Sequence, residues 1–362
     1  MKKLLPLRFL LAINILIGCT TAWTQGITTP RTPSPAAEVS QTIGISKVTV
    51  NYSRPSVKGR VIWGDLVPYG WNVQAFGNQN SAPWRAGANE NTTIEFSHAA
   101  KVEGQMVPAG LYGLFFTIYE DNTAEVILSK DSRSWGSFFY EPDHDQLRAK
   151  IQTRTHPMTE LLTYDFINMT KNSGELVLNW ENKQFPVMIE FAVDDIVMAN
   201  AGEELKGVAG FSFQGYSAAA NYALQNKVNV GQAVDWADKA VTMNPNFNTL
   251  STKAGLLRLE GKTADAEKVQ AEALTIANET ELNTYGYTLL NQGDKAGAIS
   301  IFKTNTDRHP QSANAWDSLG EGYALSDDKE NAIKCFKKSL TLNPNDGTKA
   351  NSMKYLKKLG AL

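Results

Sequence analysis

The sequence predicts two domains in series, an antiparallel β-sandwich followed by an α-helical repeat solenoid. Between residues 45 and 193, apolar residues alternate with period two, which turns one face of each strand inward. From residue 216 onward, apolar and small residues recur at helical spacing in units of 33, 32 and 34 residues, aligned on Ala233, Ala266, Ala298 and Ala332. Such a period is typical of a repeat array. A chain of 362 residues, 42% of them hydrophobic, is long enough for two cores.

Residues 1–25 predict an export signal. The segment opens with MKKLLPLR and continues with an apolar run from Phe9 to Ile17, which is shorter than the roughly 20 residues that a membrane-spanning helix needs. Two processing sites stay open. LIGC at residues 16–19 resembles a lipobox that would lipidate Cys19, and TTA at residues 20–22 suits a signal peptidase. We therefore expect an exported protein of the periplasm or cell envelope, which meets the membrane only through a lipid on Cys19 if one is attached.

Charge and cysteine content exclude two further features. The formal net charge is -2, and the 35 Lys and Arg residues less the three in the export signal leave 32 against 37 acidic residues. Nucleic-acid binding needs a clustered basic surface, which this balance does not provide. Apart from Cys19 the chain has one cysteine, Cys335, so the mature protein cannot form an intramolecular disulfide. Its stability must come from packing.

Composition and turn signals divide the chain. Residues 26–40 form a Pro/Thr-rich linker, and residues 41–195 form the β-domain, with a turn expected at Glu181-Asn182-Lys183 and a short helix near Asp143 to Ala149. A connector over residues 196–212 is short and partly apolar, so the array is expected to pack near the sandwich. Residues 213–347 hold about four repeats and residues 348–362 a capping helix, because such arrays need a polar outer face at their ends.

Several separated motifs give the first domain a family resemblance. They are NYSRP at 51–55, VKGR at 57–60, LVPYG at 66–70, WRAGANE at 84–90, VEGQMVPAGLYGLFFTIYE at 102–120 and WG at 135–136. With these motifs in this order, residues 41–193 resemble the secreted bacterial domain of unknown function catalogued as family 2911. The resemblance implies no function. One departure is that residues 71–83 separate the LVPYG and WRAGANE motifs, which lie close together in the family.

The second half resembles the tetratricopeptide repeat, a pair of antiparallel helices that stacks on its neighbours. The last unit carries the pattern most fully, with Trp316, Leu319, Gly320, Tyr323, Ala332, Phe336 and then Asn343-Pro344-Asn345. Pro344 ends the second helix because it cannot continue the hydrogen-bond ladder. Unit two departs from the pattern, with Gln270 where an aromatic residue and Asn278 where proline is expected.

Repeat arrays of this kind present a concave groove that generally holds peptides or partner proteins. Transferring the groove positions unit by unit predicts a partner-binding set that is mixed and nearly neutral: Tyr222, Gln225, Arg258, Asn283, Tyr287, Asn291, Asn314, Asp317 and Glu321. This set lacks the Lys and Arg cluster that clamps a C-terminal carboxylate in chaperone-type repeats. A purely structural array with solvated residues at these positions is the alternative.

The loop WRAGANE is the candidate ligand site of the β-domain, with Trp84, Arg85, Asn89 and Glu90 as its candidate residues. Arg85 and Glu90 would orient a polar ligand, and Trp84 beside a second tryptophan would offer an aromatic platform for a glycan. The structural alternative is that the Arg and Glu pair across the loop while the tryptophans cover an open end of the sandwich.

No motif predicts a cofactor, a metal or a catalytic residue. The four histidines form no helix-spaced pair, and neither a nucleophile elbow nor a P-loop nor a dinucleotide fingerprint occurs. Asp143-His144-Asp145 is the densest cluster of metal-ligating types, although neighbours in sequence rarely converge on one ion. The leading hypothesis is an exported, non-enzymatic protein that binds a protein or peptide. A carbohydrate-binding module is one alternative. A hydrolase or other enzyme with a site around Arg85 and Glu90 is the other, with His98 and Asp143 as further candidates for the same cleft.

Overall fold

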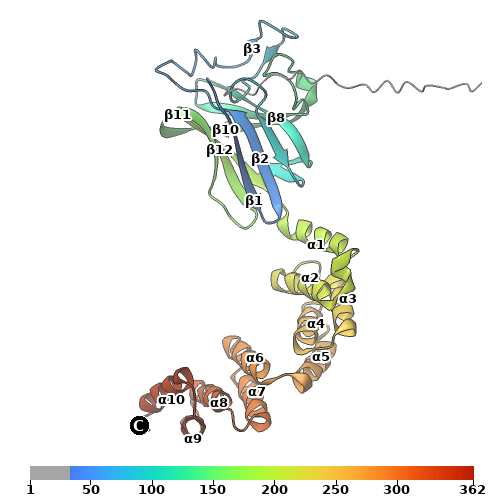
Figure 1. Cartoon of the computed structure of the whole chain (residues 1–362), viewed down its shortest axis with the longest axis vertical. Helices are drawn as coiled ribbons and strands as arrows, with labels where there is room; N and C mark the ends of the chain where they lie inside the picture. Colours follow the sequence, from blue (N-terminus) through green and yellow to red (C-terminus); the bar gives the residue numbers. More distant parts are fainter. Residues whose placement is uncertain (1–32) are drawn as a thin grey trace, which may run out of the picture.

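The computed structural model describes residues 33–362, and Figure 1 shows β-sheets at one end and a curved row of helices at the other. The predicted export signal, Cys19 and residues 26–32 of the predicted linker lie outside the described residues. No described helix has the length and apolar character required to cross a membrane.

The β-domain consists of two antiparallel sheets, as predicted. The six-stranded sheet has the order β1-β2-β5-β8-β9-β10 and the four-stranded sheet the order β11-β12-β6-β7. The first contains β1 (Ala36–Ile43), β2 (Ser46–Ser53), β5 (Thr93–Phe96), β8 (Gly110–Ile118), β9 (Thr123–Ser129) and β10 (Asp145–Gln152). The second contains β6 (Ala100–Val102), β7 (Gln105–Val107), β11 (Arg154–Ile167) and β12 (Ser173–Glu190). One buried cluster draws side chains from both sheets, so they pack face to face.

Three local predictions in this domain were wrong. Strand β1 includes residues 36–40, which the proline content had assigned to the linker. Residues 173–190 form one continuous strand, so the turn predicted at residues 181–183 is absent. The turn signal instead marks a bulge, at which Glu181 takes a positive φ of 52° and the pairing with β11 shifts register. The expected helix near Asp143 is only the 3₁₀ turn Pro142–His144, and β10 follows at once.

Residues 71–83, the segment that separates the LVPYG and WRAGANE motifs, form a small hairpin on the outer face of the larger sheet. Its strands are β3 (Asn72–Val73) and β4 (Ser81–Ala82). Ala82 joins Phe115, Ile127 and Tyr140 in a separate buried cluster, with Trp71 packed against it. The insertion therefore buries the apolar outer side of β8 and β9 rather than extending either sheet.

The predicted connector is a packed helix. α1 (Val193–Glu204) starts three residues after β12, and a 3₁₀ turn (Val208–Phe211) follows it. Val193 belongs to the sandwich core, while Met198 belongs to the first core of the array. Lys171 of the β-domain donates to Asp194 at 2.9 Å and to Asn226 of α2 at 2.9 Å. These contacts tie the array to the sandwich.

The helices after α1 pair as the repeat pattern predicts: α2 (Phe213–Asn226), α3 (Val230–Met243), α4 (Phe247–Leu259), α5 (Thr263–Ile276), α6 (Glu279–Asn291), α7 (Lys295–Arg308), α8 (Ala313–Leu325), α9 (Lys329–Leu340) and the final α10 (Asp346–Lys358). The four aligned alanines are all fully buried. Gly320 is small because a Cβ there would lie 2.9 Å from the Phe336 ring. The packing of the Phe336 ring thus requires glycine at position 320.

Candidate functional site

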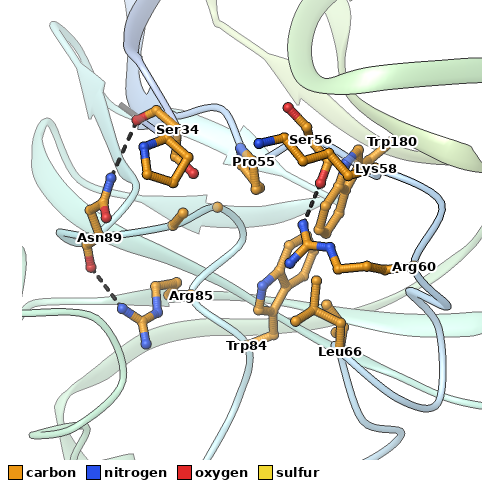
Figure 2. A pocket seen from close by; sticks show the side chains of 14 residues that line it. Ser34, Pro55, Ser56, Lys58, Arg60, Leu66, Trp84, Arg85, Asn89 and Trp180 are labelled. Atoms are coloured by element: carbon orange, nitrogen blue, oxygen red, sulfur yellow. Dashed lines mark hydrogen bonds between the residues drawn. The ribbon is translucent and has the colours of Figure 1, made fainter. Parts of the chain in front are cut away.

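The loop from Trp84 to Glu90 continues the larger sheet before it turns. The Trp84 amide donates to the Phe116 carbonyl at 2.8 Å, and the Phe116 amide donates back at 2.9 Å, so Trp84 is fixed beside β8. Its indole stacks on that of Trp180, with centroids 5.8 Å apart and planes 15° apart, and meets Trp63 edge-on at 5.9 Å. Three tryptophans distant in sequence therefore form one cluster, of which Figure 2 shows Trp84 and Trp180.

Arg85 shapes the loop. Its Nη1 donates to the Asn89 carbonyl at 2.7 Å, and its guanidinium lies 5.2 Å from the centre of the Phe138 ring. Burial lowers the pKa of Arg85, which remains cationic at neutral pH because the ordinary value is so high. Ala86 and Asn89 take positive φ angles of 53° and 62°, and Asn89 donates to the Ser34 carbonyl at 3.3 Å. The hydrogen bond from the Arg85 side chain to Asn89 thus closes the tight turn between these two residues.

A cavity of about 490 Å³ opens beside this loop, and we call it the β-domain cavity. Of the four residues of the predicted ligand site, Trp84, Arg85 and Asn89 line this cavity, whereas Glu90 does not. The other lining residues are Pro33, Ser34, Pro55, Ser56, Lys58, Arg60, Leu66, Val67, Gly87, Ala88 and Trp180. Sequence reasoning did not select Lys58, Arg60 or Trp180 as site residues. Lys58 and Arg60 stand in one of the quoted motifs, VKGR, so that signal was available.

The two alternative functions of this domain, glycan binding and catalysis, each require a specific arrangement of side chains. A glycan platform needs Trp84 and a second tryptophan exposed in one plane, but its coplanar neighbour Trp180 is only 1% exposed. The enzyme alternative places Arg85 and Glu90 in one cleft, but of these two only Arg85 lines the cavity. The further candidates His98 and Asp143 do not line it either. His98 follows the far end of β5, where its Nδ1 lies 3.0 Å from Ser97 Oγ.

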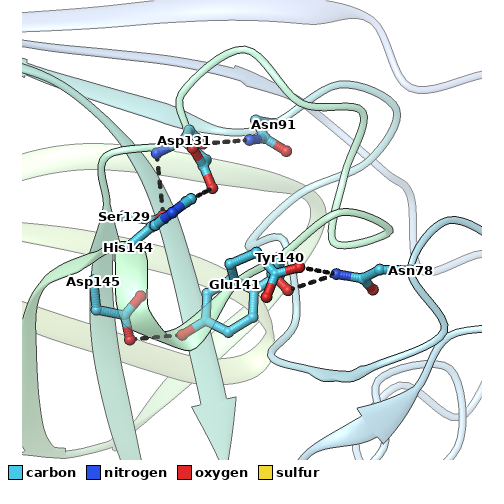
Figure 3. Close-up of polar contacts among 8 residues, drawn as sticks. All are labelled: Asn78, Asn91, Ser129, Asp131, Tyr140, Glu141, His144 and Asp145. Carbon is cyan, nitrogen blue, oxygen red and sulfur yellow. Dashed lines mark hydrogen bonds and ion pairs between the residues drawn. The ribbon is translucent and has the colours of Figure 1, made fainter.

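Polar groups at residues 129–145 form a network that anchors loops (Figure 3). His144 Nδ1 lies 2.6 Å from Asp131 Oδ2, and this carboxylate raises the pKa of the histidine. The Tyr140 hydroxyl donates to Asp145 at 2.6 Å, and Asn78 of the insertion donates to the Tyr140 carbonyl at 3.0 Å. In the described part of the chain, no group of three His, Cys, Asp or Glu residues is arranged to hold a metal ion. The network explains how the insertion is held.

The predicted partner-binding residues of the array do not share one groove. The Tyr222 hydroxyl donates to Asp194 at 2.7 Å and so belongs to the domain junction. Tyr287 donates to Glu321 at 3.0 Å, and residues of α10 hydrogen-bond Asp317 and Glu321. Asn283 is half-buried, and its Oδ1 has no partner in the described residues. The remaining predicted positions are exposed to solvent: Gln225, Arg258, Asn291 and Asn314.

An open groove of about 490 Å³ instead lies between α2 and α4, and we call it the α2–α4 groove. Its lining residues are uncharged: Phe213, Gln214, Ser217, Ala218, Asn221, Leu224, Asn248, Ser251 and Thr252. On α2 these positions lie one residue before those obtained by aligning the alanines. The turn after α2 explains the offset. Lys227 takes the left-handed conformation six residues before Ala233, whereas Gly261 does so five residues before Ala266.

Comparisons with known proteins agree with this architecture. Residues 34–189 match the family model described as protein of unknown function (DUF2911), and residues 313–346 match the tetratricopeptide repeat model. The chain therefore carries a DUF2911 domain followed by a tetratricopeptide repeat region, and such repeats generally bind proteins or peptides. No curated protein matches.

Solved structures similar to part of this chain include three proteins. YrrB, described as a TPR protein with an unusual peptide-binding site, is 20% identical and aligns over 44% of this chain and 84% of its own, with a TM-score of 0.29. The pilF protein of Pseudomonas aeruginosa is 22% identical over 42% of this chain and 71% of its own, with a TM-score of 0.29. MamA is 16% identical over 44% and 91%, with a TM-score of 0.30.

Proposed function

We propose that this chain is an exported cell-envelope protein that binds a protein or peptide partner in the α2–α4 groove. The observation that carries the proposal is the groove itself, an open, uncharged channel between the first helices of two consecutive repeat units. The export part rests on the basic and apolar pattern of residues 1–25, and Cys19 is the residue that a lipid anchor would modify.

The chemistry of the groove favours an extended peptide. Gln214, Ser217 and Asn221 follow one another at helical spacing along α2, and Asn248, Ser251 and Thr252 lie opposite on α4. Hydroxyl and amide side chains both donate and accept hydrogen bonds, so they match the alternating N–H and C=O groups of a peptide backbone. Phe213 and Leu224 add apolar contacts to the same groove. None of the lining groups titrates near neutral pH, which supports binding rather than acid–base catalysis.

The test uses the full mature chain carrying Ser251→Arg, which places a long cationic side chain in the groove. Ser300→Arg on α7 is the matched control, because Ser300 is an exposed helical serine outside the groove. Each protein is incubated with cell-envelope extract, and the retained partners are identified by mass spectrometry. We expect a partner that the wild type and Ser300→Arg retain and that Ser251→Arg loses, with equal unfolding midpoints for all three. Retention that ignores Ser251→Arg would contradict the proposal.

A further inference from the structure

The β-domain cavity is lined by charged side chains of positive sign only. All three charged residues that line it are cationic: Lys58, Arg60 and Arg85. Arg60 is held in place because its guanidinium donates to the carbonyls of Ser56 and Val57, the latter at 3.1 Å. These acceptors are neutral, so the positive charge of Arg60 is not cancelled by an ion pair (Figure 2).

One carboxylate, that of Glu160, contacts the backbone of Lys58 at the edge of the cavity. Glu160 accepts a hydrogen bond from the backbone amide of Lys58 at 2.9 Å, and it is exposed to solvent. The charge of a solvent-exposed carboxylate is weakened by water, and this single negative charge faces three cations, those of Lys58, Arg60 and Arg85. Among the described residues, neither Lys58 nor Arg60 forms a salt bridge. The rim keeps a net positive charge.

An independent observation lies at the wall of the cavity. Trp180 is only 1% exposed, lines the cavity, and its Nε1–H has no acceptor within the described residues. Buried donors are almost always hydrogen-bonded, because leaving one unpaired costs its full desolvation. The neighbouring Trp63 shows the ordinary case, since its Nε1 donates to Glu181 at 2.9 Å. The Trp180 Nε1–H is therefore a buried donor that no acceptor among the described residues satisfies.

From these two observations we propose that the β-domain cavity binds a small organic oxyanion, a carboxylate or a phosphate monoester, that carries an apolar ring or chain. The anionic group lies between Lys58 and Arg60, and an oxygen of the ligand accepts from Trp180. The apolar part packs on Trp84, Leu66 and Val67, which supply the hydrophobic portion of the lining. A cavity of about 490 Å³ is of the size that holds such ligands. This site is separate from the α2–α4 groove.

The experiment is isothermal titration of the full mature chain at low ionic strength with four probes. Benzoate and phenyl phosphate represent the two oxyanions, benzyl alcohol is the neutral analogue, and inorganic phosphate is the anion without an apolar part. We expect saturable binding of benzoate or phenyl phosphate, about tenfold tighter than that of benzyl alcohol or inorganic phosphate, and weakened by added salt. Whichever aromatic anion binds more tightly identifies the oxyanion class.

Variants locate the binding. Lys58→Glu reverses a charge on an exposed side chain and is expected to weaken binding of the better anion about tenfold or more. Lys101→Glu is the matched control, because Lys101 is an exposed lysine elsewhere in the same domain, on β6. Trp180→Phe keeps an aromatic ring but removes the donor, and about a fivefold loss is expected. If neither aromatic anion binds saturably, or if Lys58→Glu binds as tightly as Lys101→Glu, the proposal is wrong.

Discussion

The two ends of the repeat array share one architecture but use the same helix face differently. Between α2 and α4 the face is an open, uncharged groove. Between α6, α8 and α10 it is filled by internal hydrogen bonds, in which Tyr287 and Tyr355 both donate to Glu321 at 3.0 Å and Asn351 donates to Asp317 at 2.8 Å. Near the C-terminus, the helix face that such arrays generally offer to a partner is therefore covered by the protein's own side chains. In the described part of the chain, the open groove of the array lies at its first end.

The helix crossings differ in the same sense. Phe302 and Phe336 pack against Gly286 and Gly320 in the last two units. The corresponding positions in the first two units hold Ala237 and Gln270, as the alanine spacing shows. A large ring against a glycine fills the crossing at the C-terminal end, so stability is expected to concentrate there.

The largest expected effect tests this packing difference. Phe336 is fully buried and stacks on Tyr355 with centroids 5.1 Å apart, so Phe336→Ala should lower the free energy of unfolding of the last unit by about 3–5 kcal/mol. Gln270→Ala, at the same position of unit two, should cost less than about 1.5 kcal/mol because Gln270 makes only a 3.5 Å hydrogen bond to Ser251. Urea denaturation followed by circular dichroism measures both. Equal losses would remove the distinction.

The next prediction concerns the pH dependence of the closed end. Burial raises the pKa of Asp317 above its ordinary value of 3.8, although Ser352 and Asn351 donate to it. The folded chain therefore binds more protons than the unfolded chain between pH 3.8 and the raised pKa. Stability due to this group falls as the pH rises through that window.

Asp317→Asn removes this titration. Its melting temperature relative to the wild type should increase from pH 4 to pH 7. Asp307→Asn, at an exposed position of α7, is the matched control. Scanning calorimetry across this range measures both. The opposite slope for Asp317→Asn would show that its hydrogen bonds outweigh its burial.

A smaller effect separates internal packing from partner binding. Tyr287→Phe loses the hydrogen bonds to Ser318 and Glu321, so the free energy of unfolding should fall by about 1 kcal/mol. Tyr285→Phe is the control, because Tyr285 packs against Phe247 by its ring. Partner retention in the envelope-extract assay should be the same for both variants. Loss of the partner with Tyr287→Phe alone would reopen the closed end as a binding surface.

The smallest expected effect lies at the junction beside the open end. Lys171 and then Tyr222 lower the pKa of Asp194 by hydrogen bonding, so the stability from this group is present above pH 3.8 and is lost as the pH falls through the lowered pKa. Tyr222→Phe should cost about 0.5–1 kcal/mol at pH 7 and less in acid. Tyr216→Phe, which keeps a ring facing Lys239, is the control. Urea denaturation at pH 7 and pH 3 provides the comparison, and a larger loss in acid would contradict this assignment.

The candidate sites show how far residue patterns reach. Trp84, Arg85 and Asn89 were predicted together because they are neighbours in one loop, and they do line one cavity. Trp180 was not, because it comes from β12 and reaches the cavity only when the two sheets pack. The groove positions on α2 were displaced by one residue, because the alanine alignment cannot reveal an extra residue in the turn at Lys227.

The sequence by itself determined the order of two domains and the repeat character of the second, because period-two and helical periodicities are local properties of the chain. The buried alanines and the glycine opposite Phe336 were likewise readable, since close helix crossings admit only small residues. Tertiary structure alone decided which polar faces stay open. The Asp317 and Glu321 carboxylates accept hydrogen bonds from α10, and Trp180 Nε1 lies buried without an acceptor among the described residues. Both outcomes depend on contacts between segments far apart in sequence.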